Sequence, residues 1–394
     1  MKNIAIFSLA YAPFFGGAEV AVKEITHRLR DGFKFICFTY KFDKAWRQEE
    51  ELDGIKIVRV GQGKDNKQGY YGGHFYKIVY IFLSFLAARK QHQKEPFTQI
   101  WAIMAAYAGG AALLFKLFYP QVPLLLTLQE GDSEEHILGR LGIFYPFWKM
   151  LFKKADHIQV ISTYLEDFAR RHGAKCPITV VPNGADLENI KNQISKIKDE
   201  NNKSKIKKNK RSVTIITTSR LVRKNGIDTL VEAAKELKNN NLYFKVLIAG
   251  GGPEDRSLRA LAKKLAVDDV VEFLGEVLPV EVPLYLAHAN IFVRASRSEG
   301  LGNSFIEAMA AGLPIIGTNV GGIPDFLKDP SLVGITHATG LFARVGDGKD
   351  LAHKILFLIN KPELAEIIVK NARDLVFKNY SWDKIALKMG ELFV

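Results

Sequence analysis

The stretch from Asn290 to Gly317 reads NIFVRASRSEGLGNSFIEAMAAGLPIIG. It begins with the apolar run 290–293 and ends with the run 314–317, and short runs of this kind are typical of strands buried on both faces. A glycine-rich loop and a helical pattern over 304–311 separate the two runs. The order strand, helix, strand predicts two parallel strands joined by a right-handed crossover.

The same alternation extends in both directions from this stretch. Further strands are predicted at 3–9, 33–39, 55–60, 100–104, 123–128, 157–162, 178–181, 213–218, 243–249 and 270–274. Further helices are predicted at 19–30, 163–172, 228–238, 254–266, 280–288, 349–359 and 362–377. We therefore predict the α/β class, with two Rossmann-like, doubly wound domains that face each other. Such sheets bind ligands outside the carboxyl ends of their strands, so two facing domains would form an interdomain cleft.

The domain boundaries are predicted from a change in composition. Residues 190–211 hold nine lysines and arginines and only two acidic residues, with few apolar side chains. We interpret them as a mobile linker between an amino-terminal domain, 1–189, and a carboxyl-terminal domain, 212–378. The final residues, 379–394, either close the second domain or cross back to the first.

Composition excludes several classes of protein. Of the 394 residues, 47% are hydrophobic and 25% are charged, which is globular composition. The net charge is +13, but +7 of it lies in 190–211, so nucleic-acid binding is not expected. Two cysteines cannot form a disulfide framework, which favours a cytoplasmic protein. The charge-free run 100–115 is shorter than the ~20 residues that span a bilayer.

Two carboxylates eight residues apart, Glu299 and Glu307, flank the glycine-rich loop. We expect Glu307 to bind vicinal hydroxyls such as those of a ribose, and Glu299 to bind sugar hydroxyls. Backbone amides at a helix start attract phosphate. The residues expected to present them, or to lie beside them, are Gly300, Leu301, Gly302, Asn303 and Ser304. A purely structural alternative for Glu307 is a capping box with Ser304.

Two further motifs carry the chemistry of phosphate binding. Residues 219–228, SRLVRKNGID, place Arg220, Arg223 and Lys224 after a predicted strand, and such cations suit a diphosphate. Gly16 and Gly17 lie between the first strand and the first helix, where an anionic group could approach the backbone. A solvated basic loop and a plain tight turn are the respective alternatives.

Together these motifs resemble glycosyltransferase family 4, the retaining glycosyltransferases of group 1 type with the GT-B fold. The resemblance covers nearly the whole chain. It rests on the Glu299–Glu307 spacing before EAMAAGLP, on the two loops above, and on four further segments, 155–162, 182–184, 248–254 and 321–325.

The resemblance implies roles for individual residues. Arg220 and Lys224 would offset charge on the donor diphosphate, Glu299 would contact the transferred sugar and Glu307 would hold the ribose. Gly16 would approach the donor phosphate together with Gly17. Two positions depart from the family pattern. Asn225 stands where a lysine is usual, and Gln129 stands where a histidine is common. Acceptor-side roles are then open for Gln129, Glu130, Asp132 and His136.

The implied activity is transfer of a hexosyl group from a UDP-, GDP- or ADP-sugar to a lipid-linked, polysaccharide or small-molecule acceptor. No cofactor or metal ion is expected, since cations and amides would offset the diphosphate charge. The alternatives are an inactive nucleotide-sugar-binding protein and a nucleotide-sugar 2-epimerase. Aromatic and basic residues within 75–86 and 143–154 allow peripheral binding to an anionic membrane surface, although a core-facing role explains them too. The sequence does not indicate an oligomeric state.

Overall fold

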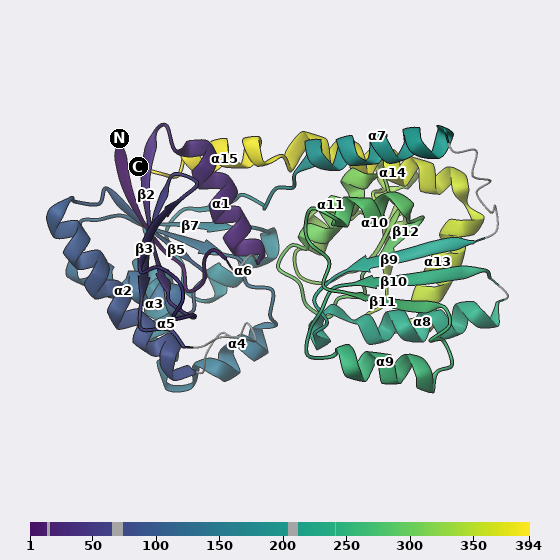
Figure 1. Cartoon of the computed structure of the whole chain (residues 1–394), viewed down its shortest axis with the longest axis horizontal. Coiled ribbons are helices and arrows are strands. Elements are labelled where there is room, and N and C mark those ends of the chain that lie inside the picture. The colour runs from purple at the N-terminus through teal and green to yellow at the C-terminus, as the bar shows by residue number, and fades with distance from the viewer. Residues whose placement is uncertain (14–15, 65–73, 204–211, 241) are drawn as a thin grey trace. The chain divides into compact units, whose positions relative to one another are not determined.

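The computed structural model describes residues 1–13, 16–64, 74–203, 212–240 and 242–394. It divides into two compact units (Figure 1). Unit 1 comprises Met1–Asn183 and Trp382–Val394, and unit 2 comprises Gly184–Ser381. Each unit is built on its own sheet, so the predicted pair of doubly wound α/β domains is confirmed.

The sheet of unit 1 has eight strands in the order β3-β4-β2-β1-β5-β6-β7-β8. Every pairing is parallel except that of β3 with β4, which form a hairpin. The strands are β1 (Lys2–Phe7), β2 (Phe33–Tyr40), β3 (Glu49–Leu52), β4 (Ile55–Val60), β5 (Gln99–Ile103), β6 (Leu124–Leu128), β7 (His157–Val160) and β8 (Ile178–Val180).

Helices cover both faces of this sheet (Figure 1). The helices are α1 (Gly17–Leu29), α2 (His74–Lys94), α3 (Tyr107–Phe118), α4 (Glu134–Leu141), α5 (Tyr145–Lys154), α6 (Thr163–Arg171) and α15 (Trp382–Gly390). Alternate residues of β1 show the two faces. Ile4 and Ile6 belong to the core that includes residues of α1 and α15, whereas Phe7 packs against Phe115 of α3, with ring centroids 6.1 Å apart.

Unit 2 contains a six-stranded parallel sheet in the order β11-β10-β9-β12-β13-β14. The strands are β9 (Val213–Thr218), β10 (Phe244–Ala249), β11 (Val271–Gly275), β12 (Ile291–Val293), β13 (Ile315–Thr318) and β14 (Leu341–Ala343). The α-helices are α7 (Leu187–Lys203), α8 (Ile227–Asn239), α9 (Asp255–Lys264), α10 (Val282–His288), α11 (Asn303–Ala311), α12 (Pro330–Val333), α13 (Gly348–Asn360) and α14 (Pro362–Asn379).

The predicted linker is wrong over residues 190–203. The chain leaves unit 1 after Asn183, and α7 already belongs to unit 2. Leu187, Ile190 and Ile194 recur at helical spacing and are all buried, and α7 packs against α10 and α11. A narrow apolar stripe is enough to pack a helix against its neighbours. The prediction was wrong because it relied on the high overall polarity of the segment and not on the spacing of its few apolar residues. The remaining residues of the predicted linker, 204–211, lie outside the described residues.

The carboxyl-terminal segment crosses back to unit 1, the second of the two predicted alternatives. Helix α14 ends in unit 2, and α15 packs against α1 in unit 1. Phe393 is buried in unit 1. Its ring lies 5.5 Å from that of Phe33, 5.7 Å from that of Phe35 and 5.1 Å from that of Trp101, measured between centroids.

We expect Phe393→Ala to destabilise unit 1 by ~3 kcal/mol or more, because truncating a buried phenylalanine typically costs about 3–5 kcal/mol. Denaturant unfolding followed by circular dichroism measures this loss. Leu387→Ala is the control, since Leu387 lies on α15 but is 68% exposed, and it should change stability by less than ~0.5 kcal/mol. Equal stability of the two variants would contradict the packing described for the carboxyl terminus.

Candidate functional site

The glycine-rich loop of unit 2 connects β12 to α11. Gly302 precedes the first residue of α11 and has φ +98°, a conformation that side-chain-bearing residues rarely adopt. A Cβ at Gly321 would lie 1.8 Å from the carbonyl oxygen of Glu299, so only glycine permits this close approach. The amide of Gly322 donates a hydrogen bond to that same carbonyl oxygen at 3.2 Å. Gly321 and Gly322 therefore hold the backbone of Glu299 in place.

The guanidinium of Arg294 joins the glycine-rich loop to the basic loop after β9. Its Nη2 lies 2.6 Å from Oε2 of Glu299, and both side chains are about nine-tenths buried. The same Nη2 donates to Oδ1 of Asn225 at 3.0 Å, and Nη1 donates to Oγ of Ser304 at 2.7 Å. One buried cation thus contacts the predicted sugar-binding carboxylate, the start of α11 and the basic loop.

Arg297 adds a second connection between the same two loops. Its guanidinium forms two hydrogen bonds to the carboxylate of Asp228, at 2.7 and 2.8 Å, and a third to the carbonyl oxygen of Arg223. The backbone amide of Arg297 donates to the carbonyl oxygen of Lys224 at 2.6 Å. These bonds hold the basic loop and the glycine-rich loop in a fixed relation at the carboxyl ends of β9 and β12.

Within the basic loop, Arg220 is exposed and Lys224 is half-buried. Asn225, which departs from the family pattern, is 2% exposed. Its amide donates to the carbonyl oxygen of Arg220 at 2.7 Å, while its oxygen accepts from Arg294. Asn225 therefore supports the loop from within.

Glu307 lies one turn into α11. The capping box predicted as an alternative role does not form, because α11 begins at Asn303 and the Ser304 hydroxyl accepts from Arg294. The Glu307 residue is half-buried. Burial of its carboxyl raises the pKa to about 7, although the nearby positive charge of Arg294 acts in the opposite direction. No intramolecular partner that would explain a structural role is seen for this carboxyl among the described residues.

In unit 1, Gly16 and Gly17 form the turn into α1 and both are exposed. The amide of Gly16 donates to Oε2 of Glu19 at 2.9 Å, so the chain's own carboxylate occupies this helix start. Burial raises the pKa of Glu19, and hydrogen bonds from the backbone partly oppose that rise. The neighbouring residues 14–15 lie outside the described residues.

The four predicted acceptor-side residues separate into two groups. Gln129 accepts a hydrogen bond from Asn183 at 3.1 Å, and Glu130 is 8% exposed with Oε1 bonded to the amide of Ala105 at 2.7 Å. Burial raises the pKa of Glu130 to about 7. His136 instead lies exposed in the first turn of α4, and Asp132 is half-buried in the loop before that helix.

No group of three or more His, Cys, Asp or Glu side chains that could hold a metal ion occurs in the described part of the chain. In the acidic run around the start of α4, Glu134 already has partners. Glu134 contacts Arg171 at 2.7 Å and Nε2 of His172 at 2.9 Å.

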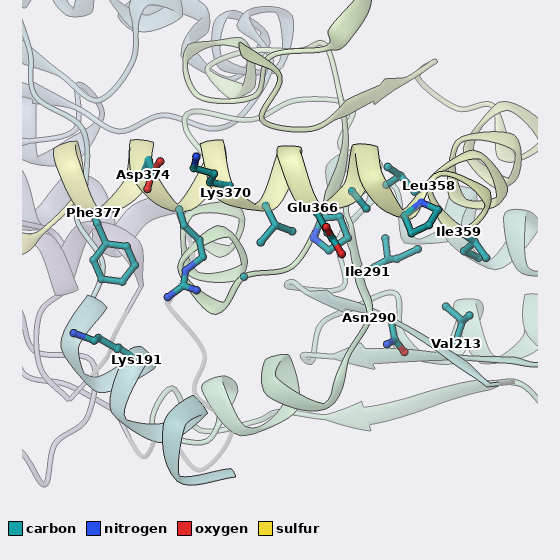
Figure 2. A pocket seen from close by; sticks show the side chains of 16 residues that line it. Lys191, Val213, Asn290, Ile291, Leu358, Ile359, Glu366, Lys370, Asp374 and Phe377 are labelled. Carbon is teal, nitrogen blue, oxygen red and sulfur yellow. The ribbon is translucent and has the colours of Figure 1, made fainter. Parts of the chain in front are cut away.

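A pocket of about 890 Å³ in unit 2 lies apart from these residues. It is lined by side chains of α14, by Lys191 of α7, and by Val213, Asn290 and Ile291 near the amino ends of β9 and β12 (Figure 2). The residues that line it include none of the predicted site residues. Because parallel sheets bind ligands at the opposite strand ends, we do not place the site there.

Arg294 and Arg297 are the site residues that no sequence motif predicted. A signal was present, since Arg294 directly follows the apolar run 290–293, where a charge at a strand end is uncommon. The hairpin of β3 and β4 was missed as well. Its turn, Asp53-Gly54, has positive φ at both residues, as the Asp-Gly pair in a two-residue hairpin predicts.

Two family models match the chain, and each covers most of one unit. The model for "Glycosyltransferase Family 4" matches residues 15–189, and the model for "Glycosyl transferases group 1" matches residues 198–375. An uncharacterised glycosyltransferase of Methanocaldococcus jannaschii is 26% identical over 97% of this chain and 95% of its own length. A GDP-mannose-dependent alpha-(1-6)-phosphatidylinositol monomannoside mannosyltransferase of Mycobacterium tuberculosis is 30% identical over 60% of this chain and 61% of its own length.

Solved structures share the fold over the whole chain. Sucrose-phosphate synthase from Thermosynechococcus elongatus superposes with a TM-score of 0.80 at 22% identity, covering 100% of this chain and 98% of that one. HepE from Anabaena, in complex with UDP and glucose, gives a TM-score of 0.74 at 17% identity, covering 100% and 99%.

The raised pKa of Glu307 predicts a pH-dependent stability. The Glu307 carboxyl has a pKa of about 7 in the folded protein and about 4.5 in the unfolded chain. Its contribution to the free energy of unfolding is therefore greatest at low pH and is lost as the pH rises through 7. Glu307→Gln should therefore match wild type near pH 5 and exceed it at pH 8. We expect a gain of ~2 kcal/mol, or a rise of about 4–8 °C in the unfolding midpoint.

Thermal unfolding from pH 5 to pH 8 tests this, with the exposed residue Glu366 on α14 as the control. Glu366→Gln should follow the wild-type curve at every pH. If Glu307→Gln also runs parallel to wild type, the Glu307 carboxyl is not held in a desolvating site.

Proposed function

The chain belongs to the family 4 glycosyltransferases of the group 1 type and has their GT-B fold. From this premise we propose that it transfers a hexosyl group from a nucleotide diphosphate sugar with retention at the anomeric carbon. The observation that carries the proposal is the Arg294 contact with Glu299, Asn225 and Ser304. It supports a single donor site in unit 2, in which the glycine-rich loop and the basic loop act together.

The proposed reaction breaks the bond between the anomeric carbon and the β-phosphate oxygen, and it forms a bond from the acceptor oxygen to the same carbon. Negative charge develops on the departing phosphate. Preorganised donors aimed at such charge stabilise the transition state without reorganising, and losing one typically costs ~3 kcal/mol, or about 10²-fold. Arg220, Lys224 and the start of α11 supply these donors in our proposal.

The acceptor proton passes to the departing phosphate oxygen in this scheme, so no side-chain base is required. Gln129 is compatible with that route, since its amide cannot act as a base. The cations and backbone amides offset the diphosphate charge, so we propose that transfer is metal-independent. Glu307 accepts hydrogen bonds from the ribose hydroxyls, and its ionised form is the better acceptor.

We propose a lipid-linked or carbohydrate acceptor on the side of unit 1. Two curated relatives are named for lipid acceptors, the mannosyltransferase above and an alpha-monoglucosyldiacylglycerol synthase of Streptococcus pneumoniae that is 26% identical over 80% of this chain. Among the described residues, no helix is long and apolar enough to cross a membrane.

An exposed apolar surface of unit 1 supports peripheral attachment to a membrane. Phe82 and Leu86 of α2 are 56% and 54% exposed, and Phe118 of α3 is 60% exposed. The exposed cations Arg89 and Lys90 follow on α2. Large apolar side chains beside lysine and arginine favour an anionic interface. The stretch 143–154 contributes less than expected, because its side chains at 148 and 152 are buried in the core.

Arg220→Ala and Glu307→Ala should each lower kcat/KM about 10²-fold, since each removes a group that binds the donor. The assay follows release of nucleoside diphosphate from UDP-, GDP- and ADP-sugars by purified protein, with EDTA present throughout. Arg373→Ala and Glu366→Ala are matched controls on α14, at the pocket away from the site, and should retain wild-type rates. Wild-type rates in both site variants would contradict the proposed donor site.

A double variant, Phe82→Asp with Leu86→Asp, should abolish co-sedimentation with vesicles that contain phosphatidylglycerol, because it replaces the apolar contact with like charge. Wild type should pellet, and less so at high salt. Leu332→Asp is the control, since Leu332 is 68% exposed but lies in unit 2. Wild-type protein that stays in the supernatant at low salt would refute membrane attachment.

A further inference from the structure

A second pocket, of about 500 Å³, lies within unit 1. It is bounded by the loop after β1, by α1 and by the β3–β4 hairpin, and its walls include Trp46, Glu50, Asp53 and Arg59. The loop after β1 and the end of β4 place it at the carboxyl ends of parallel strands, where α/β sheets bind ligands. The Gly16–Gly17 turn follows in the same loop.

Arg59 occupies a position where the strand pattern predicts an apolar residue. It lies on the same face of β4 as Ile55 and Ile57, which belong to the core that includes residues of α1. The Arg59 residue is only 2% exposed. Its guanidinium donates to the carbonyl oxygens of Ala12 and Arg47, at 2.7 and 3.0 Å. Hydrogen bonds offset much of the cost of burying a charge, so these two bonds fix the pocket wall.

The Arg59 side chain is not fully satisfied within the described residues. Its Nη2 pairs with Oε1 of Glu50 at 2.5 Å, but its Nε is buried without a hydrogen-bond partner. A buried donor that is left unpaired destabilises a protein by about 1–3 kcal/mol.

Trp46 provides an aromatic surface beside this polar wall. Its ring lies 5.5 Å from the Arg59 guanidinium, and the residue is half-buried, whereas the side chains of the other three tryptophans are at most 5% exposed. A partly exposed aromatic ring in a pocket with a few fixed polar groups is suited to a ligand that has both an apolar face and polar edges.

The charges of the pocket disfavour an anion as its main ligand. Three cations line it, Lys23, Arg47 and Arg59, against the two carboxylates Glu50 and Asp53. Glu50 pairs with Arg59, and Asp53 lies 3.4 Å from the Lys23 amine. The charge therefore nearly cancels, and paired carboxylates and cations present both acceptors and donors to an uncharged polyhydroxy compound.

We propose that this pocket binds a pyranose ring of the acceptor, with Trp46 stacked on the ring and the Arg59–Glu50 pair hydrogen-bonded to its hydroxyls. The acceptor is then already glycosylated, as a glycolipid or an oligosaccharide. This inference rests on the proposed function, because it assigns the pocket to the substrate that receives the hexosyl group.

Saturation-transfer difference NMR on the intact protein tests it, with methyl glycosides of glucose, galactose, mannose and N-acetylglucosamine and with maltose as probes. We expect signals from at least one probe with wild type, a loss of at least 5-fold in Trp46→Ala, and retention in Trp46→Phe, which keeps an aromatic surface. Tyr243→Ala, which removes an exposed aromatic of unit 2, should retain the signals. Thermal unfolding shows whether each variant folds.

Two results would overturn the inference. One is the absence of any probe signal with wild type, or a signal that persists in folded Trp46→Ala. The other is a response of the Trp46 indole resonance to inorganic phosphate but not to the glycosides, which would make the pocket an anion site. Binding of UDP, GDP or ADP to wild type is measured separately, so that failure of the proposed function is distinguished from failure of this inference.

Discussion

The contacts of the buried Arg294 guanidinium are the interactions on which the proposed donor site of unit 2 depends. The guanidinium contacts a carboxylate and a hydroxyl of the glycine-rich loop and the start of α11, and an amide oxygen of the basic loop. Removing one partner from a buried ion pair typically costs about 3–5 kcal/mol, because the other charge remains desolvated. The Glu299 carboxylate is therefore held by Arg294 and by the Gly300 amide, which donates to its Oε1 at 3.2 Å, while its backbone carbonyl accepts from the Gly322 amide.

This constraint explains why the two departures from the family pattern have different consequences. Asn225 is buried and accepts from Arg294 while it donates to the Arg220 carbonyl oxygen, a dual role that a lysine could not fill, since lysine only donates. In the proposed donor site, the positive charge that this loop offers to phosphate is then left to Arg220 and Lys224. At Gln129 the departure is local, because the side chain is bonded to Asn183 within unit 1.

Much of the architecture could be predicted because buried parallel strands are nearly continuous apolar runs. The runs at β1, β9 and β10 are clear in the sequence, as is the glycine-rich loop before α11. The α7 helix could not be predicted from overall polarity, because three buried side chains among many lysines decide its packing. Arg294 and Arg297 were missed because their importance lies in contacts with residues about 70 positions earlier in the chain, which no local pattern reveals.

The two glycine loops differ in their readiness to bind an anion, although both precede a helix. In unit 1 the amide of Gly16 already donates to Glu19, so a phosphate would have to displace a carboxylate of like charge. In unit 2 the glycine loop lies beside Arg294, and the adjoining basic loop carries Arg220 and Lys224. For the proposed donor, the electrostatics of the two loops therefore favour unit 2 as the part that binds the pyrophosphate. The Gly16 amide is therefore engaged within its own helix start, unlike the amides beside Arg294 in unit 2.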